Sequence, residues 1–364
     1  QFMKSISFTV TNDLSQDQRM NRICSSLIDA GYQATLIGRN RRMSESLVAK
    51  PFIQKRIPCF FEKGKLFYLE YNLRIFCFLL FSKYDAYCAV DLDSILPNYL
   101  VSKIKRKPLI YDAHEYFTEL EEVVSRPFTK KVWKTLERLI LPKIKYGYTV
   151  SEGYKNLFSN EYGANLDIIR NATVLADFVS NKKAEKYILY QGAVNHGRGL
   201  ENLVSIMEHI DCKLIICGNG DILTDLKRTV REKNLSKKIE FKGFVNPLEL
   251  LSYTRNATVG ITLFANAGLS NQYSLANRFF DYMHACVPQL AMNYPEYNSF
   301  NNQWEIAILL EDLTPLLIQQ SLVKLLSDEE YYNKLARNCE AARQLNNWQE
   351  EEKKLVTIYD NIFR

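Results

Sequence analysis

The sequence predicts an α/β protein made of two doubly wound parallel sheets, each with helices on both faces. Its 364 residues suit two domains, because one domain commonly takes about 100 to 200 residues. Short apolar runs typical of buried strands alternate with helical segments along both halves of the chain. With 47% hydrophobic and 24% charged residues, the composition excludes fibrous and largely disordered proteins.

The first half begins with a βαβ unit. Residues 5–10 alternate like a strand, residues 17–30 have helical periodicity, and residues 34–38 are again strand-like. Further buried strands are expected at 86–90, 109–111 and 147–150. We therefore predict an N-terminal domain over residues 1–172.

The second half repeats this pattern. Strands are expected at 187–190, 213–217, 239–241, 258–263 and 289–292, and helices from about 200, over 222–233 and over 275–285. We predict a C-terminal domain over residues 173–347, with the polar stretch 180–186 as the linker. A last helix within 348–364 is long enough to pack back on the N-terminal domain.

Charge is distributed unevenly along the chain. Residues 1–150 hold 24 Lys and Arg against 15 Asp and Glu, while the remainder is slightly acidic. A basic first half suits an anionic membrane or substrate, although solvated surface is the simpler explanation for any one basic cluster. Nucleic-acid binding is disfavoured, because no recognition-helix pattern and no aromatic-interleaved basic strand accompanies the clusters.

An apolar segment at residues 66–81 has two interpretations. It contains Glu70, Asn72 and Arg74 and falls short of the ~20 residues that span a bilayer. A buried helix is favoured, and a helix lying in a membrane interface is the alternative.

Two features bear on the compartment. The eight cysteines are scattered without the spacing of a disulfide framework or a zinc site, and no signal-peptide pattern is present. We expect a cytoplasmic protein, at the inner face of the membrane if its basic half contacts lipid, with no metal site.

Ligands of doubly wound sheets bind beyond the carboxyl ends of the strands, so the residues after each predicted strand are candidates. Residues 191–199 carry Gly192 and lead into a helix, with Arg198 near its start. A cation there opposes the helix dipole unless an anion binds, so we expect Arg198 to hold a phosphate. An exposed arginine in a glycine-rich turn is the alternative.

A second candidate lies at the helix predicted over 275–285. We expect Ser274 as its N-cap, with backbone N–H groups of Ser274 and Leu275 ready for a diphosphate. Asn277, Arg278 and Asp281 share one helix face, which we expect to line a cleft. Arginines suit a departing diphosphate and a carboxylate suits a ribose diol, whereas a surface pair of Arg278 with Asp281 is the simpler alternative.

A third candidate follows the strand at 109–111. His114 could hydrogen-bond sugar hydroxyls, oriented by Asp112 or Glu115, and a structural histidine is as good an explanation.

A fourth candidate consists of two glycine turns after strands. They would let the backbone approach a flat base, and each is a weak signal alone. Their residues are Gly218, Asn219, Gly243, Phe244 and Val245.

Taken in order, these segments resemble the retaining glycosyltransferases of family 4, also called glycosyl transferases group 1. The resemblance rests on 197–199, 217–220, 241–245 and 274–283 in the second half and on 112–115 and 150–152 in the first. It implies a GT-B fold, in which two Rossmann-like domains face a central cleft. By this resemblance Arg198 and Arg278 hold the diphosphate, Asp281 the ribose and His114 the transferred sugar.

The resemblance also implies the chemistry. The donor is expected to be a UDP-, GDP- or dTDP-sugar, and the acceptor a saccharide or a lipid-linked molecule. Transfer is expected with retention of configuration and without a metal or another cofactor. Synthesis of a cell-surface polysaccharide or glycoconjugate, with peripheral membrane contact through the basic N-terminal domain, is the expected role.

Three departures from the family pattern keep other functions open. Tyr273 replaces the first of two glutamates, Ala193 replaces an arginine, and residues 11–19 replace a glycine-rich loop. In that last segment Asp17 and Arg19 become candidates for the acceptor and sugar side. The alternatives are a non-catalytic nucleotide-sugar binding or scaffold protein and a sugar-nucleotide epimerase.

Overall fold

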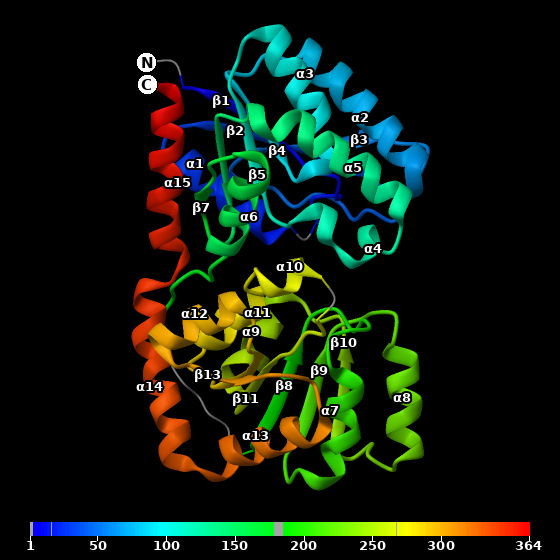
Figure 1. The fold of residues 1–364 in the computed structure, drawn as a ribbon, viewed down its shortest axis with the longest axis vertical. Coiled ribbons are helices and arrows are strands. Elements are labelled where there is room, and N and C mark those ends of the chain that lie inside the picture. Colours follow the sequence, from blue (N-terminus) through cyan, green and yellow to red (C-terminus); the bar gives the residue numbers. More distant parts are fainter. Residues whose placement is uncertain (1–2, 16, 178–184, 267) are drawn as a thin grey trace. The chain divides into compact units, whose positions relative to one another are not determined.

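The computed structural model describes residues 3–15, 17–177, 185–266 and 268–364 (Figure 1). The chain forms two compact units, which are described separately below. Unit 1 comprises residues 1–171 and 351–364, and unit 2 comprises residues 172–350.

Unit 1 is built on a parallel sheet with the strand order β3-β2-β1-β4-β5-β6-β7. The strands are β1 (Ser5–Thr9), β2 (Gln33–Asn40), β3 (Ile53–Pro58), β4 (Ala86–Val90), β5 (Leu109–Ala113), β6 (Tyr146–Thr149) and β7 (Asp167–Ile168). The strand order reverses at β1 and β4, which pair directly, with Ile6 opposite Ala86. Such a switch point leaves a crevice for ligands beyond the carboxyl ends of the strands.

Helices cover both faces of this sheet. They are α1 (Gln18–Asp29), α2 (Gly64–Phe81), α3 (Ile95–Lys105), α4 (Glu121–Val124), α5 (Pro127–Ile140), α6 (Glu152–Tyr162) and most of α15 (Trp348–Phe363). Because side chains alternate along a strand, Phe8 of β1 faces α15, with its ring 6.2 Å from that of Tyr359. On the other face, Ile37 and Tyr87 share a core cluster with α2.

The apolar segment at 66–81 forms helix α2. The buried side chains are spaced four residues apart, which places them on one face of the helix. They are Phe67, Tyr71, Ile75 and Leu79. One face of α2 is therefore buried, which both interpretations of this segment allow, and no helix of the described residues is long and apolar enough to cross a bilayer.

Unit 2 has a second parallel sheet, with the order β10-β9-β8-β11-β12-β13. Its strands are β8 (Tyr187–Gln191), β9 (Lys213–Cys217), β10 (Ile239–Gly243), β11 (Val259–Thr262), β12 (Gln289–Met292) and β13 (Ala307–Leu310). Its helices are α7 (Leu200–Ile206), α8 (Leu223–Glu232), α9 (Pro247–Asn256), α10 (Leu269–Gln272), α11 (Asn277–His284), α12 (Pro295–Trp304), α13 (Pro315–Ser327) and α14 (Glu329–Leu345). The order reverses at β8 and β11, so the crevice of this sheet lies beyond those strands.

Helix α15 belongs to both units. Its first residues complete unit 2, where Trp348 N–H donates to the Thr173 carbonyl oxygen at 2.9 Å. Its remaining turns complete the core of unit 1, where fully buried Tyr359 places its hydroxyl 3.2 Å from that of Tyr148.

The sequence-based expectations and the structure differ at a few elements. Strands β3, β7 and β13 were not predicted, and helix α11 begins two residues later than expected. Residues 180–184 of the predicted linker lie outside the described residues.

Candidate functional site

In unit 2, the loops after β8, β9 and β10 hydrogen-bond to one another through their backbones. Gly192 N–H donates to the Cys217 carbonyl oxygen at 2.9 Å, and Gly218 N–H donates to that of Gly243 at 2.7 Å. At Gly218, where φ is 151°, a Cβ atom would lie 1.8 Å from the Gly192 carbonyl oxygen. This close approach requires glycine. The structure thus brings together three predicted glycines, at 192, 218 and 243.

Arg278 lies beside this glycine cluster and is only 8% exposed. Its Nη1 donates to the Gln191 carbonyl oxygen at 3.0 Å. Its guanidinium carbon lies 4.7 Å from the ring centre of Tyr190 and 4.6 Å from that of Phe264. A Cβ on Gly192 would come within 2.8 Å of Nη1, so that glycine also leaves room for the guanidinium. The backbone and the two rings therefore fix the orientation of Arg278.

Arg198 approaches the same aromatic ring from another loop. Its guanidinium carbon lies 4.7 Å from the ring centre of Phe264, and the guanidinium of Arg278 lies against the same ring. Gly199, in the left-handed conformation with φ 67°, separates Arg198 from the first residue of α7. Two guanidinium groups at one ring repel each other, and a bound diphosphate would relieve that repulsion. The two predicted phosphate ligands therefore converge.

The expected N-cap of the helix after 275 was wrong. The Ser274 hydroxyl donates to the Ser270 carbonyl oxygen at 2.8 Å, so it is committed to the preceding helix α10. The chain stays extended at Ala276, and α11 begins at Asn277, an exposed residue. Leu275, next to the partly buried Ser274, packs partly against the core of unit 2.

Asp281 lies on α11 within a polar cluster. Its Oδ1 accepts from the Thr173 hydroxyl at 2.7 Å, and its Oδ2 accepts from the side-chain amide of Gln191 at 3.0 Å. The Gln191 Oε1 in turn accepts from the Thr254 hydroxyl at 2.7 Å. These hydrogen bonds hold the Asp281 carboxylate in place.

The last predicted residues of unit 2 are at the ends of β9 and β10. The Asn219 side chain is exposed, while the backbone carbonyl oxygen of this residue accepts from Val194 N–H at 2.9 Å. Phe244 is exposed, and Val245 packs against the buried core cluster that contains Tyr187 and Tyr282. An exposed aromatic ring next to this glycine cluster offers a surface on which a flat base can stack.

In unit 1, His114 lies beyond β5 in an ionic cluster. Its Nε2 is 2.9 Å from Asp112 Oδ2. The other oxygen of Asp112, Oδ1, accepts from Arg19 Nη2 at 3.0 Å, and Arg19 Nη1 donates to the Ile169 carbonyl oxygen at 2.9 Å. Asp112 is fully buried and Arg19 is nearly so. Arg19 thus positions Asp112, and Asp112 orients His114.

Sequence reasoning missed Asp91, which directly follows β4. Its Oδ1 accepts from the backbone N–H of His114 at 2.8 Å and from that of Glu115 at 3.2 Å, and its Oδ2 lies 3.8 Å from His114 Nδ1. Asp91 has a positive φ of 56°, which is unusual for a residue other than glycine. Asp91 could have been found from its position directly after a strand, since ligands bind beyond the carboxyl ends of strands.

These contacts shift the pKa values of the cluster. Burial on its own would raise the pKa of Asp112, but the charges and hydrogen bonds of Arg19 and His114 outweigh it and hold that pKa below its usual value. Burial disfavours the charged form of His114, yet Asp112 and Asp91 prevail and raise its pKa. Burial also raises the pKa of Asp91. The cluster favours a protonated His114, which can donate to a ligand oxygen.

The two other predicted residues of unit 1 are Asp17 and Glu115. Asp17 is the N-cap of α1, where its carboxylate accepts from Met20 N–H at 2.9 Å. Glu115 has an exposed side chain next to His114. Across the described parts of the chain, no three His, Cys, Asp or Glu side chains gather in a way that would hold a metal ion.

Comparison with solved structures identifies the fold. A sucrose-phosphate synthase from Thermosynechococcus elongatus superposes with a TM-score of 0.82 at 16% identity, covering 99% of each chain. A glycosyltransferase from Rickettsia africae ESF-5 gives a TM-score of 0.77 at 14% identity over 100% of both chains. Anabaena HepE, solved in complex with UDP and glucose, gives 0.77 at 12% identity over 98% of this chain and 100% of its own.

The fold is GT-B. Units 1 and 2 are its two Rossmann-like domains, as the sequence predicted. Residues 175–342, most of unit 2, match the family model of glycosyl transferases group 1. No curated protein matches the sequence.

Proposed function

We propose that this GT-B chain transfers a sugar from a nucleoside-diphosphate sugar to a saccharide or lipid-linked acceptor. The observation that carries the proposal is the convergence of Arg198 and Arg278 on the ring of Phe264. The diphosphate gains negative charge as it leaves, so fixed cations at its position lower the barrier. Losing one such group typically slows an enzyme about 100- to 1000-fold.

Each remaining site residue has a role in this proposal. The backbone around Gly192 and Gly218 approaches the diphosphate, Asp281 accepts from a ribose hydroxyl, and Phe244 stacks on the base. His114 donates to the transferred sugar.

Finer features of the reaction are also proposed. We infer transfer with retention and without a metal or cofactor, because the arginines supply positive charge for the diphosphate and the resemblance implies retention. We favour UDP as the nucleotide, since the similar Anabaena HepE was solved with UDP and glucose. A cytoplasmic location and contact of unit 1 with the inner membrane face, in cell-surface polysaccharide or glycoconjugate synthesis, complete the proposal.

The first experiment measures thermal stabilisation by UDP-, GDP-, CMP- and dTDP-sugars. A ligand at about 100 times its dissociation constant adds about 2.7 kcal/mol to the free energy of unfolding. We expect one nucleotide to raise the melting temperature, and we expect Arg278→Ala to abolish that rise relative to its own ligand-free state. Arg228→Ala is the matched control, because Arg228 is exposed in the same unit and, among the described residues, forms an ion pair only with Asp225 in its own helix.

Product analysis with the bound donor then separates the functions. Transfer to an added saccharide or lipid-linked acceptor, unaffected by a chelator, supports the proposal. Tight donor binding without turnover would instead support the scaffold function, which the replacements at Tyr273 and Ala193 favour. Conversion of the donor sugar without any acceptor would identify an epimerase.

A further inference from the structure

Helix α2 is apolar on its exposed face as well as on its buried face. Leu66, Leu69, Leu73 and Phe81 are between 55% and 87% exposed. Their spacing of three, four and eight residues places them on the side opposite the buried stripe. A helix that is apolar on all sides is normally buried on all sides, so this face calls for an apolar environment.

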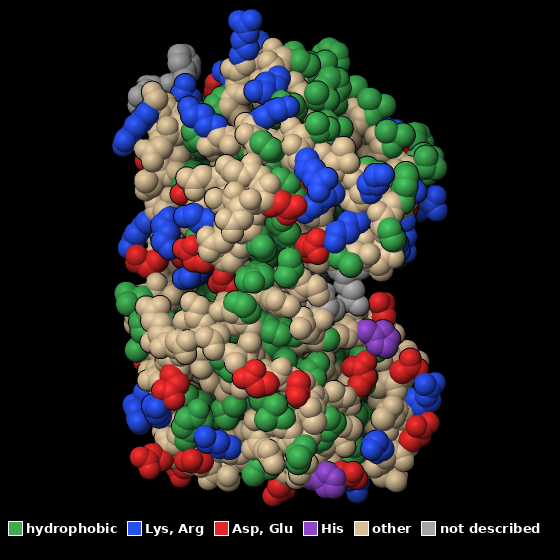
Figure 2. Space-filling view, viewed as in Figure 1, with side chains coloured by type: hydrophobic (Ala, Val, Ile, Leu, Met, Phe, Trp, Pro, Cys, Tyr) green, Lys and Arg blue, Asp and Glu red, His purple; other side chains and the backbone are tan. Residues whose placement is uncertain are grey.

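The helices beside α2 carry similar stripes. Exposed apolar side chains recur at four- or seven-residue intervals on α3 and α5. They are Leu96, Leu100 and Ile104 on α3 and Phe128, Val132 and Leu139 on α5. Figure 2 shows hydrophobic side chains gathered over the region that α2 and α3 occupy in Figure 1. Exposed apolar patches of this extent mark interaction surfaces.

Direct contacts show that the three helices are neighbours. The ring of Tyr68 on α2 meets that of Trp133 on α5 edge-on at 5.4 Å, and Lys65 Nζ lies 4.5 Å from the ring centre of Phe128. At the other end of α2, Lys105 Nζ of α3 donates to the Leu79 carbonyl oxygen at 3.0 Å. We call the joint exposed side of these helices the α2–α3–α5 face.

A basic pocket lies where α3 and α5 end. Its volume is about 350 Å³, and its lining contains no Asp or Glu. Five cationic side chains line it: Lys103, Arg106, Lys107, Lys143 and Lys145. Lys107 pairs with Asp85 at 3.1 Å, and among the described residues the other four form no ion pair. The pocket is next to the exposed Ile104, so it borders the α2–α3–α5 face.

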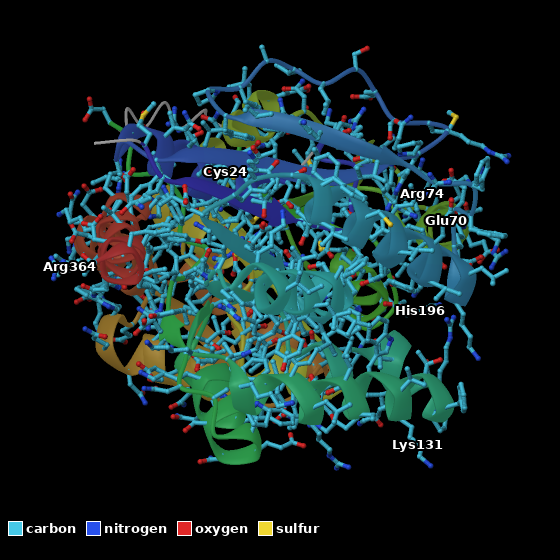
Figure 3. All side chains as sticks on the ribbon, turned by 90° about the horizontal axis from the view of Figure 1, so that it is seen from above. Cys24, Glu70, Arg74, Lys131, His196 and Arg364 are labelled. Atoms are coloured by element: carbon cyan, nitrogen blue, oxygen red, sulfur yellow. The ribbon has the colours of Figure 1, made fainter. Side chains whose placement is uncertain are left out.

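Acidic charge on α2 is neutralised locally. Glu70 accepts from Arg74 Nε at 2.8 Å, and the two side chains lie together on the helix (Figure 3). Glu70 also accepts from the backbone N–H groups of Phe60 and Phe61. The net field of the face and its border is therefore positive.

We propose that the α2–α3–α5 face binds a bilayer containing anionic lipid, with the apolar stripes in the interface and the phosphate of a lipid headgroup in the basic pocket. Apolar area and attraction to anionic headgroups are the two contributions to such binding. A second copy of the chain is a poorer partner, because it would bring two like-charged surfaces together. This inference rests on the proposed function, because it assigns to one face the membrane contact that was proposed for unit 1. Its test does not require sugar transfer.

The test is co-sedimentation of the full chain with vesicles. One set contains phosphatidylglycerol mixed with phosphatidylcholine, and the other contains phosphatidylcholine alone. The basic variant is Lys103→Gln with Lys143→Gln and Lys145→Gln, and the apolar variant is Leu69→Ser with Leu73→Ser. Because these side chains are exposed, with Lys143 and Lys145 at the surface of an open pocket, the variants should keep their melting temperatures.

We expect binding to the anionic vesicles and much weaker binding to the neutral ones. Each basic side chain near an anionic surface contributes about 1 kcal/mol, so the basic variant should lose on the order of 100-fold in partitioning. The apolar variant should also lose binding at every salt concentration. The controls are Lys233→Gln with Lys237→Gln and Leu248→Ser in unit 2, which should bind like the unaltered chain.

Three results would overturn the proposal. They are equal binding to neutral vesicles, no loss in either variant, and binding of inorganic phosphate in the pocket without any vesicle binding. A dimer that the apolar variant converts to a monomer would assign the face to a second copy. Vesicle binding without stabilisation by any nucleotide-sugar would refute the proposed transferase function and leave the membrane proposal standing. The failure of one proposal can therefore be told apart from the failure of the other.

Discussion

Replacing Arg19 by methionine should lower the free energy of unfolding, because the buried Asp112 carboxylate loses its cationic partner. The Arg19 Nη2 and Asp112 Oδ1 atoms are 3.0 Å apart, and both side chains are almost inaccessible to solvent. Removing one partner of a buried ion pair typically costs about 3–5 kcal/mol, because a buried charge is left behind. His114 still contacts Asp112, so we expect a loss near the lower end, about 3 kcal/mol.

The stability difference between the unaltered protein and Arg19→Met should depend on pH. In the unaltered protein the pKa of Asp112 is depressed, so its stabilisation is present above the pKa of the unfolded chain and is lost as the pH falls through the lower, folded value. In Arg19→Met, burial should raise the Asp112 pKa, and protonation then removes the uncompensated charge. The difference in stability between the two proteins should therefore be largest near neutral pH and should shrink towards pH ~4.

Hydrogen exchange of peptides from β1 and β5 measures the stability of unit 1 separately from that of unit 2. Arg39→Met is the matched control, since Arg39 is also buried in unit 1 and donates to the backbone carbonyl oxygen of Glu62, which carries no charge. It should lose about 1 kcal/mol at every pH. A loss below about 1 kcal/mol in Arg19→Met, or a loss that does not change with pH, would refute the reasoning.

Three further outcomes are expected. Gly218→Ala places a Cβ against a backbone oxygen and should destabilise unit 2 by about 3–5 kcal/mol in urea unfolding, whereas Gly31→Ala, with positive φ but open space, should cost about 1 kcal/mol. Burial lowers the pKa of His284 to about 4, so the unaltered unit 2 should lose roughly 2–4 kcal/mol between pH ~6.5 and ~4, and His284→Gln should not. Asp91→Asn should lower the pKa of His114, as measured by NMR titration.

Elements with a strong apolar pattern were predictable from the sequence. The buried strands β4, β9 and β12 have the expected bounds, because uninterrupted apolar runs are typical of the interior of a parallel sheet. Strand β3 was missed because it is an edge strand whose side chains are exposed or only partly buried, and its three consecutive polar residues, Gln54, Lys55 and Arg56, leave no apolar run and no alternation. Strand β13, also at an edge, is a run of four apolar residues, and so short a run does not by itself distinguish a strand from part of a buried helix.

The site was less predictable than the fold. Arg198 and Arg278 were found from their places after strands, but their meeting at Phe264 depends on tertiary contacts that no local pattern contains. The N-cap at Ser274 failed because its hydroxyl has a competing partner in α10. Asp91 followed a correctly predicted strand and could have been found by applying the same rule there.

The double membership of α15 has a consequence for synthesis. Most of unit 1 leaves the ribosome before unit 2, yet its core includes Tyr359, which packs against Phe8 and Tyr148. Unit 2, which ends at residue 350, has all of its residues before that side chain is made. Domains usually fold in the order of their synthesis. Here the synthesis of unit 1 begins before that of unit 2 and ends after it. The core of unit 1 therefore stays incomplete until all of unit 2 has been translated.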